Sequence, residues 1–404
     1  MICWRGSIRC MKSKMKNILF VIDTLRMGGA EKSLISLLKA LDPQRVAVDL
    51  YLFETGGVLQ AEVPDWVNIL EADAVTRGMT LELRNYLPDV LRSGHICAAL
   101  ARIWMTLRSR IRKEPGFSWN LVKKYIPPLE KHYDVAVGYL EGFTDFFVLD
   151  KVKAEKKIGW IHIDMTNRVL PAEEIAYYER FDEIATISEV CREAFTKHVP
   201  AAADKMHIIE NIVLAEDVVN KAEKAVQRTW DSGRFHLVTV GRLDYQKGID
   251  IAAKACKVLK DKGISVCWHV YGKGVMHDTI MQYVEENGLI KEFLLEGLAA
   301  NPYPYMKHAD FIIQPSRWEG KSIVLDEAKI LGKAIVVTDY PSVRDQITDR
   351  VTGLITGMTP EAIADGIERL IKDPALKAQL EQNAAREPNR SIRALEAFYN
   401  MIEN

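Results

Sequence analysis

Short apolar runs alternate along the chain with longer segments in which apolar residues recur at helical spacing. The runs are rich in Val, Ile, Leu and Phe, a composition typical of strands that are buried on both faces of a parallel sheet. The segments between the runs predict helices that cover the sheet, the first of them over residues 33–41. The expected strands are 18–22, 46–53, 134–140, 158–161 and 184–187 in a first series, and 235–241, 265–271, 311–314 and 334–338 in a second. The pattern therefore predicts an α/β fold.

The two series of strands and helices predict two doubly wound, Rossmann-like domains. A chain of 404 residues is too long for one ordinary core and long enough for two domains of this kind. The segment between Asn211 and Arg234 is polar and lacks strong strand signals, so we place the boundary there, with an N-terminal domain at 16–211 and a C-terminal domain at 212–388. Ligands of such sheets bind beyond the carboxyl ends of the strands. We therefore expect the site in a cleft shared by the two domains.

The composition excludes several classes of partner. The formal net charge is −1, so no overall field draws the protein to nucleic acid, and no nucleic-acid partner is expected. The six cysteines are scattered, with no CxxC pair and no spacing typical of metal ligands, so we expect a reducing, cytoplasmic location and no bound metal.

No apolar stretch approaches the length of a membrane span. The basic opening Met1–Met15 does not form a secretory signal with the brief run after it, and Met11 or Met15 is a candidate start.

The segment 77–131 differs from the rest of the chain, because it is mostly helical in pattern and basic, with apolar residues between its cations. The residues in question are the cations Arg102, Arg108, Arg110, Arg112, Lys113, Lys123 and Lys124 and the apolar residues Ile103, Trp104, Met105 and Leu107. One interpretation is a solvated helical cap on the first domain. The other is a peripheral contact with anionic lipid headgroups, which would bring the protein to the inner face of a membrane.

The first stretch with candidate chemistry is MGGAEK, which follows a strand and opens a helix. Gly28 and Gly29 permit unusual backbone angles and the close approach of a ligand. The N-terminus of the following helix offers free N–H groups and a partial positive charge to an anion. A tight turn without any ligand would have the same sequence, so this stretch alone decides nothing.

The second stretch is GRLDYQKG, residues 241–248, at the end of the first strand of the second domain. Arg242 and Lys247 place two cations where the ligand of a parallel sheet would lie. An arginine can fork onto phosphate oxygens and a lysine acts as a mobile point charge, so together they could stabilise the charge on a departing nucleoside diphosphate. The alternative is a surface loop with two solvated cations.

The third stretch begins at residue 316 and reads SRWEGKSIVLDEAKILGKAIVVTD. Glu319 is expected in a loop after a strand, and Glu327 within the helix that follows. Gly320 and Ser322 keep the backbone open and can cap that helix, so that its N-terminus points at the site. Two carboxylates in this context could bind separate hydroxyl groups of one ligand, although their spacing also recurs elsewhere in the chain.

With these three stretches in place, the chain resembles the family-4 (group 1) glycosyltransferases, which have the GT-B fold. The resemblance extends from residue 17 to the end, and its most specific part is the pair of acids that follows GRLDYQKG. It implies that Arg242 and Lys247 bind the diphosphate, that Glu319 contacts the donor sugar near its reacting carbon, and that Glu327 binds the ribose. It further implies donor contacts from the glycine loop, Gly28 and Gly29, and from backbone amides around Gly320, Lys321, Ser322 and Ile323.

The resemblance also assigns residues outside these stretches. His162, in GWIHID, matches a histidine of the family that lies near the transferred sugar and the acceptor; a satisfied structural histidine is the alternative. Asn211 would line the cleft, and Gly297 and Leu298 occupy the place of the loop that binds the base. A final helix within 389–404 would cross back onto the first domain.

The resemblance implies a retaining glycosyltransferase, in which the acceptor hydroxyl attacks from the face that the nucleoside diphosphate leaves. The donor would be a nucleotide sugar, with UDP-sugars favoured over GDP-sugars. The acceptor would be a glycan or a lipid-linked glycan in the assembly of a bacterial capsule, exopolysaccharide or lipopolysaccharide. Such enzymes need neither a cofactor nor a metal bound by a DxD motif, so neither is expected.

Two other functions are compatible with the architecture. A GT-B sugar-nucleotide epimerase would share the fold but make no glycosidic bond. A non-catalytic GT-B subunit would only assist a partner enzyme, and would be expected to have lost Arg242, Lys247 or Glu319, all of which are present. A Rossmann dehydrogenase is excluded because no GxGxxG follows any expected strand.

Overall fold

The computed structural model describes residues 15–78, 83–112, 119–166, 168–225 and 230–403. Its contacts divide the chain into two compact units that do not follow chain order. The first unit comprises the chain up to Leu25, Leu37–Trp160 and Arg180–Glu183. The second unit comprises Arg26–Ser36, Ile161–Glu179 and the chain from Ile184 onward. Two separate segments from earlier in the chain therefore group with the part that begins at Ile184.

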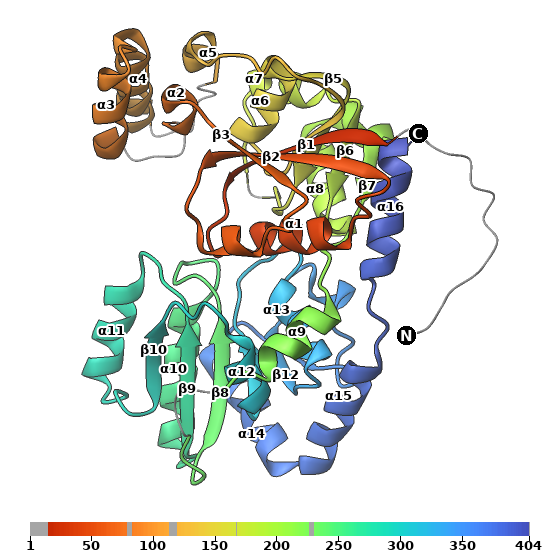
Figure 1. The fold of residues 1–404 in the computed structure, drawn as a ribbon. Helices are drawn as coiled ribbons and strands as arrows, with labels where there is room; N and C mark the ends of the chain where they lie inside the picture. Colours follow the sequence, from red (N-terminus) through yellow and green to blue (C-terminus); the bar gives the residue numbers. More distant parts are fainter. Residues whose placement is uncertain (1–14, 79–82, 113–118, 167, 226–229, 404) are drawn as a thin grey trace, which may run out of the picture. The chain divides into compact units, whose positions relative to one another are not determined.

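Two parallel sheets form the framework of the protein, as the apolar runs predict (Figure 1). Their strand orders are β3-β2-β1-β4-β5-β6-β7 and β10-β9-β8-β11-β12-β13. In both sheets the chain first builds outward from the first strand to one side and then returns to the other, which is the doubly wound Rossmann order. The strands of the first sheet are β1 (Lys16–Thr24), β2 (Val46–Glu54), β3 (Asn68–Glu71), β4 (His132–Gly138), β5 (Lys153–Ile161), β6 (Glu183–Thr186) and β7 (Met206–Ile208). Those of the second are β8 (Phe235–Val240), β9 (Val266–Tyr271), β10 (Phe293–Gly297), β11 (Phe311–Gln314), β12 (Ile335–Thr338) and β13 (Leu354–Thr356).

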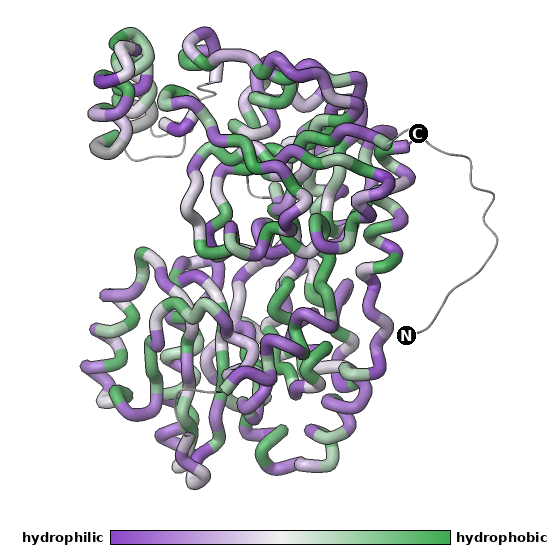
Figure 2. Tube along the Cα trace, in the orientation of Figure 1, coloured by the Kyte–Doolittle hydropathy of each residue, from purple (hydrophilic) through white to green (hydrophobic). Residues whose placement is uncertain are grey.

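Helices connect the strands. Those up to β7 are α1 (Gly29–Ala40), α2 (Ala74–Arg77), α3 (Leu83–Arg92), α4 (Ile96–Arg112), α5 (Trp119–Val122), α6 (Phe143–Lys151), α7 (Ala172–Tyr178) and α8 (Glu189–His198). Those after it are α9 (Ala215–Ala222), α10 (Ile249–Asp261), α11 (His277–Glu286), α12 (Tyr303–His308), α13 (Ile323–Ile330), α14 (Pro360–Lys372), α15 (Pro374–Arg386) and α16 (Ser391–Glu403). In Figure 2 both hydrophobic and hydrophilic residues occur within successive turns of the helices, as expected of helices that cover a sheet with one face.

The second sheet is covered on both faces by separate apolar layers. On one face, Leu237 and Trp268 pack with residues of α10, α11 and α14. On the other face, Val238 and Tyr271 pack with residues of α9, α12 and α13. Burial on both faces explains why the central strands of this sheet are recognisable as continuous apolar runs.

Several element boundaries differ from the predicted ones. The first helix begins at Gly29 rather than at residue 33, because the second glycine of the pair already belongs to the helix and Glu31 lies in its first turn. The segment between the two expected domains contains a helix, α9. At the C-terminal end, α15 stops at Arg386 and α16 contacts β7. The domain limits 16–211 and 212–388 stay a prediction.

The basic segment 77–131 contains helices, as predicted, and α3 packs against α4. Arg102 is not directed at solvent, because its guanidinium donates to the Gly78 carbonyl at 3.1 Å and to Thr106 at 2.9 Å. Lys123 lies 3.4 Å from Asp150. The side chains of Arg108, Arg110, Arg112 and Lys113 lie outside the described residues. Among the residues described, no helix has the length and apolar character needed to cross a membrane.

Gly248 is the position at which the backbone most clearly requires glycine. It precedes α10 with φ +63°, and a Cβ there would lie 2.0 Å from the Pro315 carbonyl oxygen. Gly263, just past the end of the same helix, has φ +73°, but a Cβ there would meet no described atom within 4 Å.

These two glycines give a matched pair of substitutions. We expect Gly263→Ala to cost about 1 kcal/mol of unfolding free energy, the usual strain of a left-handed alanine. Gly248→Ala adds a backbone clash to the same strain and is expected to cost more than about 3 kcal/mol. Urea denaturation followed by tryptophan fluorescence measures both. Equal losses for the two variants would show that the contact with Pro315 does not constrain this loop.

Candidate functional site

Two loops lie side by side where the second sheet reverses its strand order. Strands β8 and β11 are neighbours in this sheet, with Leu237 paired with Phe311 and Val238 with Ile312. The loop 241–248 follows β8, and the loop 315–322 follows β11. The carboxyl ends of parallel strands at such a reversal are the usual ligand site of an open α/β sheet. These two loops contain six of the candidate residues: Arg242, Lys247, Glu319, Gly320, Lys321 and Ser322.

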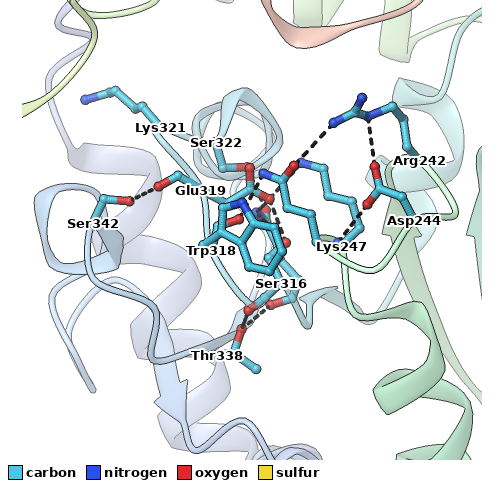
Figure 3. Close-up of polar contacts among 12 residues, drawn as sticks. Arg242, Asp244, Lys247, Ser316, Trp318, Glu319, Lys321, Ser322, Thr338 and Ser342 are labelled. Atoms are coloured by element: carbon cyan, nitrogen blue, oxygen red, sulfur yellow. Dashed lines mark hydrogen bonds and ion pairs between the residues drawn. The ribbon is translucent and has the colours of Figure 1, made fainter. Parts of the chain in front are cut away.

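The side chain of Glu319 is the centre of this region (Figure 3). Glu319 is only 5% exposed. Its Oε1 accepts hydrogen bonds from Lys247 Nζ at 2.7 Å, Ser316 Oγ at 2.6 Å and Gln314 Nε2 at 3.1 Å. Among the described residues, no side chain donates to its Oε2. A buried carboxylate needs such partners, because an unpaired charge loses its hydration without compensation.

The two predicted cations lie in different environments. Lys247 is held against Glu319, and its backbone N–H donates to Asp244 Oδ1 at 3.0 Å. The side chain of Arg242 is 65% exposed, with Nε 3.2 Å from Asp244 Oδ2 and Nη2 3.3 Å from Gln246 Oε1. One cation is therefore fixed beside the buried acid, and the other is available at the surface.

The backbone after Glu319 is held by side chains from elsewhere in the second unit. Ser342 Oγ donates to the Glu319 carbonyl at 2.7 Å, and Gln346 Oε1 accepts from the Ser322 N–H at 2.7 Å. Ser322 stands at the N-cap of α13, but its hydroxyl donates to Gln314 Oε1 at 2.7 Å. Ser322 therefore occupies the N-cap position, as predicted, but its side chain makes no capping hydrogen bond. Gln314 ends the neighbouring strand and competes successfully for the hydroxyl.

Tyr340 is fully buried in the same region of the second unit. Burial, together with the charges of Glu319 and Asp326, raises the pKa of Tyr340 well above its ordinary value. The phenol therefore stays neutral at any physiological pH. Tyr340 therefore adds no charge of its own beside Glu319 and Lys247.

Glu327 lies within α13, as predicted, and is 1% exposed. Its Oε1 accepts from Lys32 Nζ at 2.8 Å and from the Tyr303 hydroxyl at 2.7 Å. Its Oε2 is buried and has no hydrogen-bond partner in the part of the chain that the structure describes. Lys32 belongs to α1 and Tyr303 to α12, so three separate helices bring this group together. The sequence analysis did not identify either partner.

Segments from the N-terminal half lie against the loop 315–322. A Cβ on Gly29 would lie 3.8 Å from Ile323 Cδ1. A Cβ on Gly320 would lie 2.8 Å from the carbonyl oxygen of His162, so the backbone at this point tolerates glycine alone. His162 follows β5 directly, as predicted. Gly28 precedes α1, and a Cβ there would meet the Glu31 side chain.

Asn211 is also close to this loop. Its Nδ2 donates to the Lys321 carbonyl at 3.4 Å, and Lys321 Nζ is 2.9 Å from Glu210. Both Asn211 and Lys321 line a cavity of about 310 Å³ that also contains Asp345. Burial raises the pKa of the Asp345 carboxyl.

Gly297 and Leu298 lie farther along the same sheet edge. Gly297 ends β10 with φ +77°, and its carbonyl accepts from the Gly272 N–H at 2.8 Å. Leu298 is exposed. Strand β9 separates β10 from β8 in the sheet. No hydrogen bond or ion pair among the described residues joins either of them to Glu319 or Lys247.

Comparison with known proteins places this site in a family. Residues 220–387 match the family model described as glycosyl transferases group 1, and this range contains both loops. The match covers less than half of the chain, and over this range the chain is similar to group 1 glycosyltransferases. The resemblance found in the sequence is thereby confirmed for the range that contains Glu319 and Lys247.

Two curated glycosyltransferases illustrate the relationship. The alpha-D-kanosaminyltransferase of Streptomyces kanamyceticus is 25% identical over 212 residues, which are 50% of this chain and 54% of that protein. The poly(ribitol-phosphate) alpha-N-acetylglucosaminyltransferase of Staphylococcus aureus is 27% identical over 254 residues, which are 57% of this chain and 47% of that protein. The chain thus spans about half the length of the curated relatives it matches.

A solved structure extends the likeness to the whole fold. The Anabaena Alr3699/HepE protein, crystallised in complex with UDP, aligns with a TM-score of 0.66 at 16% identity, covering 96% of this chain and 100% of that one. At this identity the alignment establishes the fold alone. Together with other solved glycosyltransferases, it confirms the predicted GT-B architecture of two Rossmann-like domains.

The Lys247–Glu319 pair makes a measurable prediction about stability. Lys247→Met leaves a buried carboxylate without its cation and is expected to cost about 3 kcal/mol of unfolding free energy. Glu319→Gln removes the charge instead. The double variant is therefore expected to lose less than the sum of the single losses, with a coupling of about 1–3 kcal/mol in urea denaturation.

The control is Lys257→Met, which breaks the exposed Lys257–Asp261 pair on α10. Its cost should stay below about 1 kcal/mol. If Lys247→Met cost no more than this control, the pair would contribute nothing to the stability of the two loops.

Proposed function

We propose that the protein is a retaining glycosyltransferase that moves a sugar from a nucleotide-sugar donor, with a UDP-sugar favoured, to a glycan or lipid-linked acceptor in bacterial surface-polysaccharide assembly. The observation that carries the proposal is the Lys247–Glu319 pair, at the carboxyl edge where β8 and β11 meet, inside a group 1 glycosyltransferase domain. A buried acid and two cations at this edge match the charges of a sugar diphosphate and its transition state.

The two cations would share the diphosphate. An ammonium group has three donor hydrogens, so Lys247 can bind a phosphate oxygen while it remains beside Glu319. The exposed guanidinium of Arg242 can donate two parallel hydrogen bonds to the same diphosphate from the surface side. In this proposal these side chains, rather than a metal ion, balance the charge that builds on the leaving group.

The two acids would hold the neutral parts of the donor. Glu319 uses one oxygen for its three donors, which leaves Oε2 to accept a hydroxyl of the transferred sugar. Glu327 is arranged in the same way, because Lys32 and Tyr303 meet one oxygen and the other is buried without a partner. A ribose hydroxyl would donate a hydrogen bond to this second oxygen of Glu327. His162 would lie near the acceptor. The alternative is that His162 is a structural histidine whose hydrogen bonds are satisfied within the protein.

Two findings support the choice of UDP and of retention. The Anabaena protein of the same fold binds UDP. Both curated relatives are named for alpha-linked transfer. Since common nucleotide sugars carry an alpha linkage at the phosphate, an alpha-linked product would keep the configuration of the donor.

Turnover across a panel of donors tests this proposal. We expect the wild type to release nucleoside diphosphate from one UDP-sugar, slowly with water and faster with acceptor glycan. Glu319→Gln should lower this rate by about 100-fold or more, because it removes charge at the reacting centre. Glu327→Gln should mainly raise KM, because the ribose contact is present before and during the reaction. Liquid chromatography measures the diphosphate, and proton NMR gives the anomeric configuration of the product.

The matched control is Glu361→Gln, an exposed acid in the first turn of α14, which should leave the rate unchanged. An inverted product would contradict retention. A folded protein that binds and turns over no nucleotide sugar would favour the non-catalytic subunit, and a released free sugar-nucleotide isomer would favour the epimerase.

We further propose that the segment 77–131 contacts an anionic membrane, where a lipid-linked acceptor would reside. Four apolar side chains of α4, at helical spacing, are between 46% and 61% exposed: Ile96, Leu100, Trp104 and Leu107. Such a stripe on a helix that also carries arginines is typical of a surface that lies in the headgroup region.

Co-sedimentation with vesicles tests this contact. We expect the wild type to bind phosphatidylglycerol vesicles more strongly than phosphatidylcholine vesicles, and salt to weaken the binding. The double variant Leu100→Ser, Trp104→Ser should lower the bound fraction about tenfold, because it removes two large apolar groups from the stripe. The control Val275→Ser changes an isolated residue that is 92% exposed and should bind as the wild type does. Binding without dependence on anionic lipid would contradict the proposal.

A further inference from the structure

A second cluster of reactive side chains lies in the sheet that carries the proposed donor site, at the start of its strands. His236 and Cys267 are paired residues of β8 and β9, and His269 follows Cys267 by two positions on β9. Paired residues, and residues two apart on one strand, point to the same face of a sheet. His236, Cys267 and His269 therefore share one face, and they are 7%, 7% and 2% exposed.

Hydrogen bonds fix the outer nitrogen of each imidazole ring. His236 Nε2 lies 2.8 Å from the Asp231 carbonyl oxygen, and His269 Nδ1 lies 2.8 Å from Glu296 Oε1. A carbonyl or carboxylate oxygen only accepts, so each of these nitrogens carries a hydrogen. In a neutral ring the other nitrogen then carries a lone pair. These remaining nitrogens, His236 Nδ1 and His269 Nε2, face each other at 3.0 Å.

Two lone pairs at this distance repel each other unless a positive charge lies between them. That charge can be a proton, which would make one ring an imidazolium, or a metal ion. Cys267 favours the metal, because its Sγ lies with both nitrogens in a group whose atoms are all within 4.8 Å of one another. Two imidazoles and a thiol are ligands that Zn²⁺ prefers.

The surroundings of the cluster match those of known metal sites. Histidine ligands of metals commonly donate their second N–H to a carboxylate or a backbone carbonyl, and Glu296 and Asp231 are in these positions. The indole of Trp230 stacks on both rings, with centroids 4.6 Å from each. This aromatic cover fixes the planes of the rings.

We propose that His236, Cys267 and His269 bind one Zn²⁺, which joins the starts of β8 and β9. The Cys267 sulfur would bind as the thiolate, so metal binding releases its proton. The site lies at the amino ends of the strands, whereas the loops 241–248 and 315–322 follow the carboxyl ends. The ion would therefore stabilise the sheet and take no part in sugar transfer.

The test uses the full chain and the metal alone. Protein freed of metal by a chelator is titrated with Co²⁺, and absorption is recorded, because a thiolate bound to Co²⁺ gives an intense charge-transfer band. We expect one equivalent of Co²⁺ per chain, displaced by Zn²⁺, and a rise in Tm when Zn²⁺ is added. Cys267→Ser should lose the charge-transfer band. Glu296→Gln should keep the band and weaken binding about 10- to 100-fold, because Glu296 only orients His269.

The control is Cys256→Ser, which changes another buried thiol of the same domain outside the cluster. It should bind as the wild type does, and if Cys267→Ser fails to fold, the wild type and this control still decide the outcome. Folded wild type that binds no Co²⁺ or Zn²⁺ would overturn the proposal and leave the shared proton as the charge between the rings. A charge-transfer band that survives Cys267→Ser would overturn it as well.

Discussion

The ion pair between Lys247 and Glu319 is the constraint on which the region at the carboxyl edge of the second sheet depends. Glu319 is buried in the loop that follows β11, and a buried carboxylate needs a cation and hydrogen-bond donors in place of the water that it has lost. Lys247 comes from the loop after β8, so one interaction fixes two loops relative to each other. Ser316 and Gln314 add neutral donors from the same strand end. The pair thus creates a rigid, charged edge from two stretches that lie far apart in the sequence.

Buried polar groups are paired with a cation or a neutral donor at other places in the second unit as well. Glu327 is buried like Glu319, and it too meets a lysine and a neutral donor at one oxygen. In the cluster of His236, Cys267 and His269, two buried imidazole nitrogens face each other at 3.0 Å, and the proposed Zn²⁺ would supply the positive charge there. In each place the polar groups are positioned by the parallel sheet and the helices that cover it, and burial makes their pairing strong.

The central strands could be predicted from the sequence because burial on both faces makes them continuous apolar runs. Strands β3, β7, β10 and β13 were missed, and all four are edge strands, which have a partner on one side only. The family resemblance assigned Glu319 and Lys247 to one donor site, and the structure brings them together because their loops follow the neighbouring strands β8 and β11. The contacts of Lys32 with Glu327, and of His236 with His269, could not be predicted, because they depend on tertiary packing and on strand register that no spacing in the sequence records.

The discontinuous makeup of the second unit limits how its parts could be exchanged with those of a relative. This unit includes Arg26–Ser36 and Ile161–Glu179, which belong to the N-terminal half in sequence. A chimera joined at residue 212 would inherit Glu327 from one parent and Lys32, the cation that pairs with it, from the other. The same chimera would take Gly320 from one parent and His162, whose backbone packs against Gly320, from the other. Recombination between relatives would therefore have to preserve these matched positions in both halves, so the two halves are expected to evolve together rather than as independent modules.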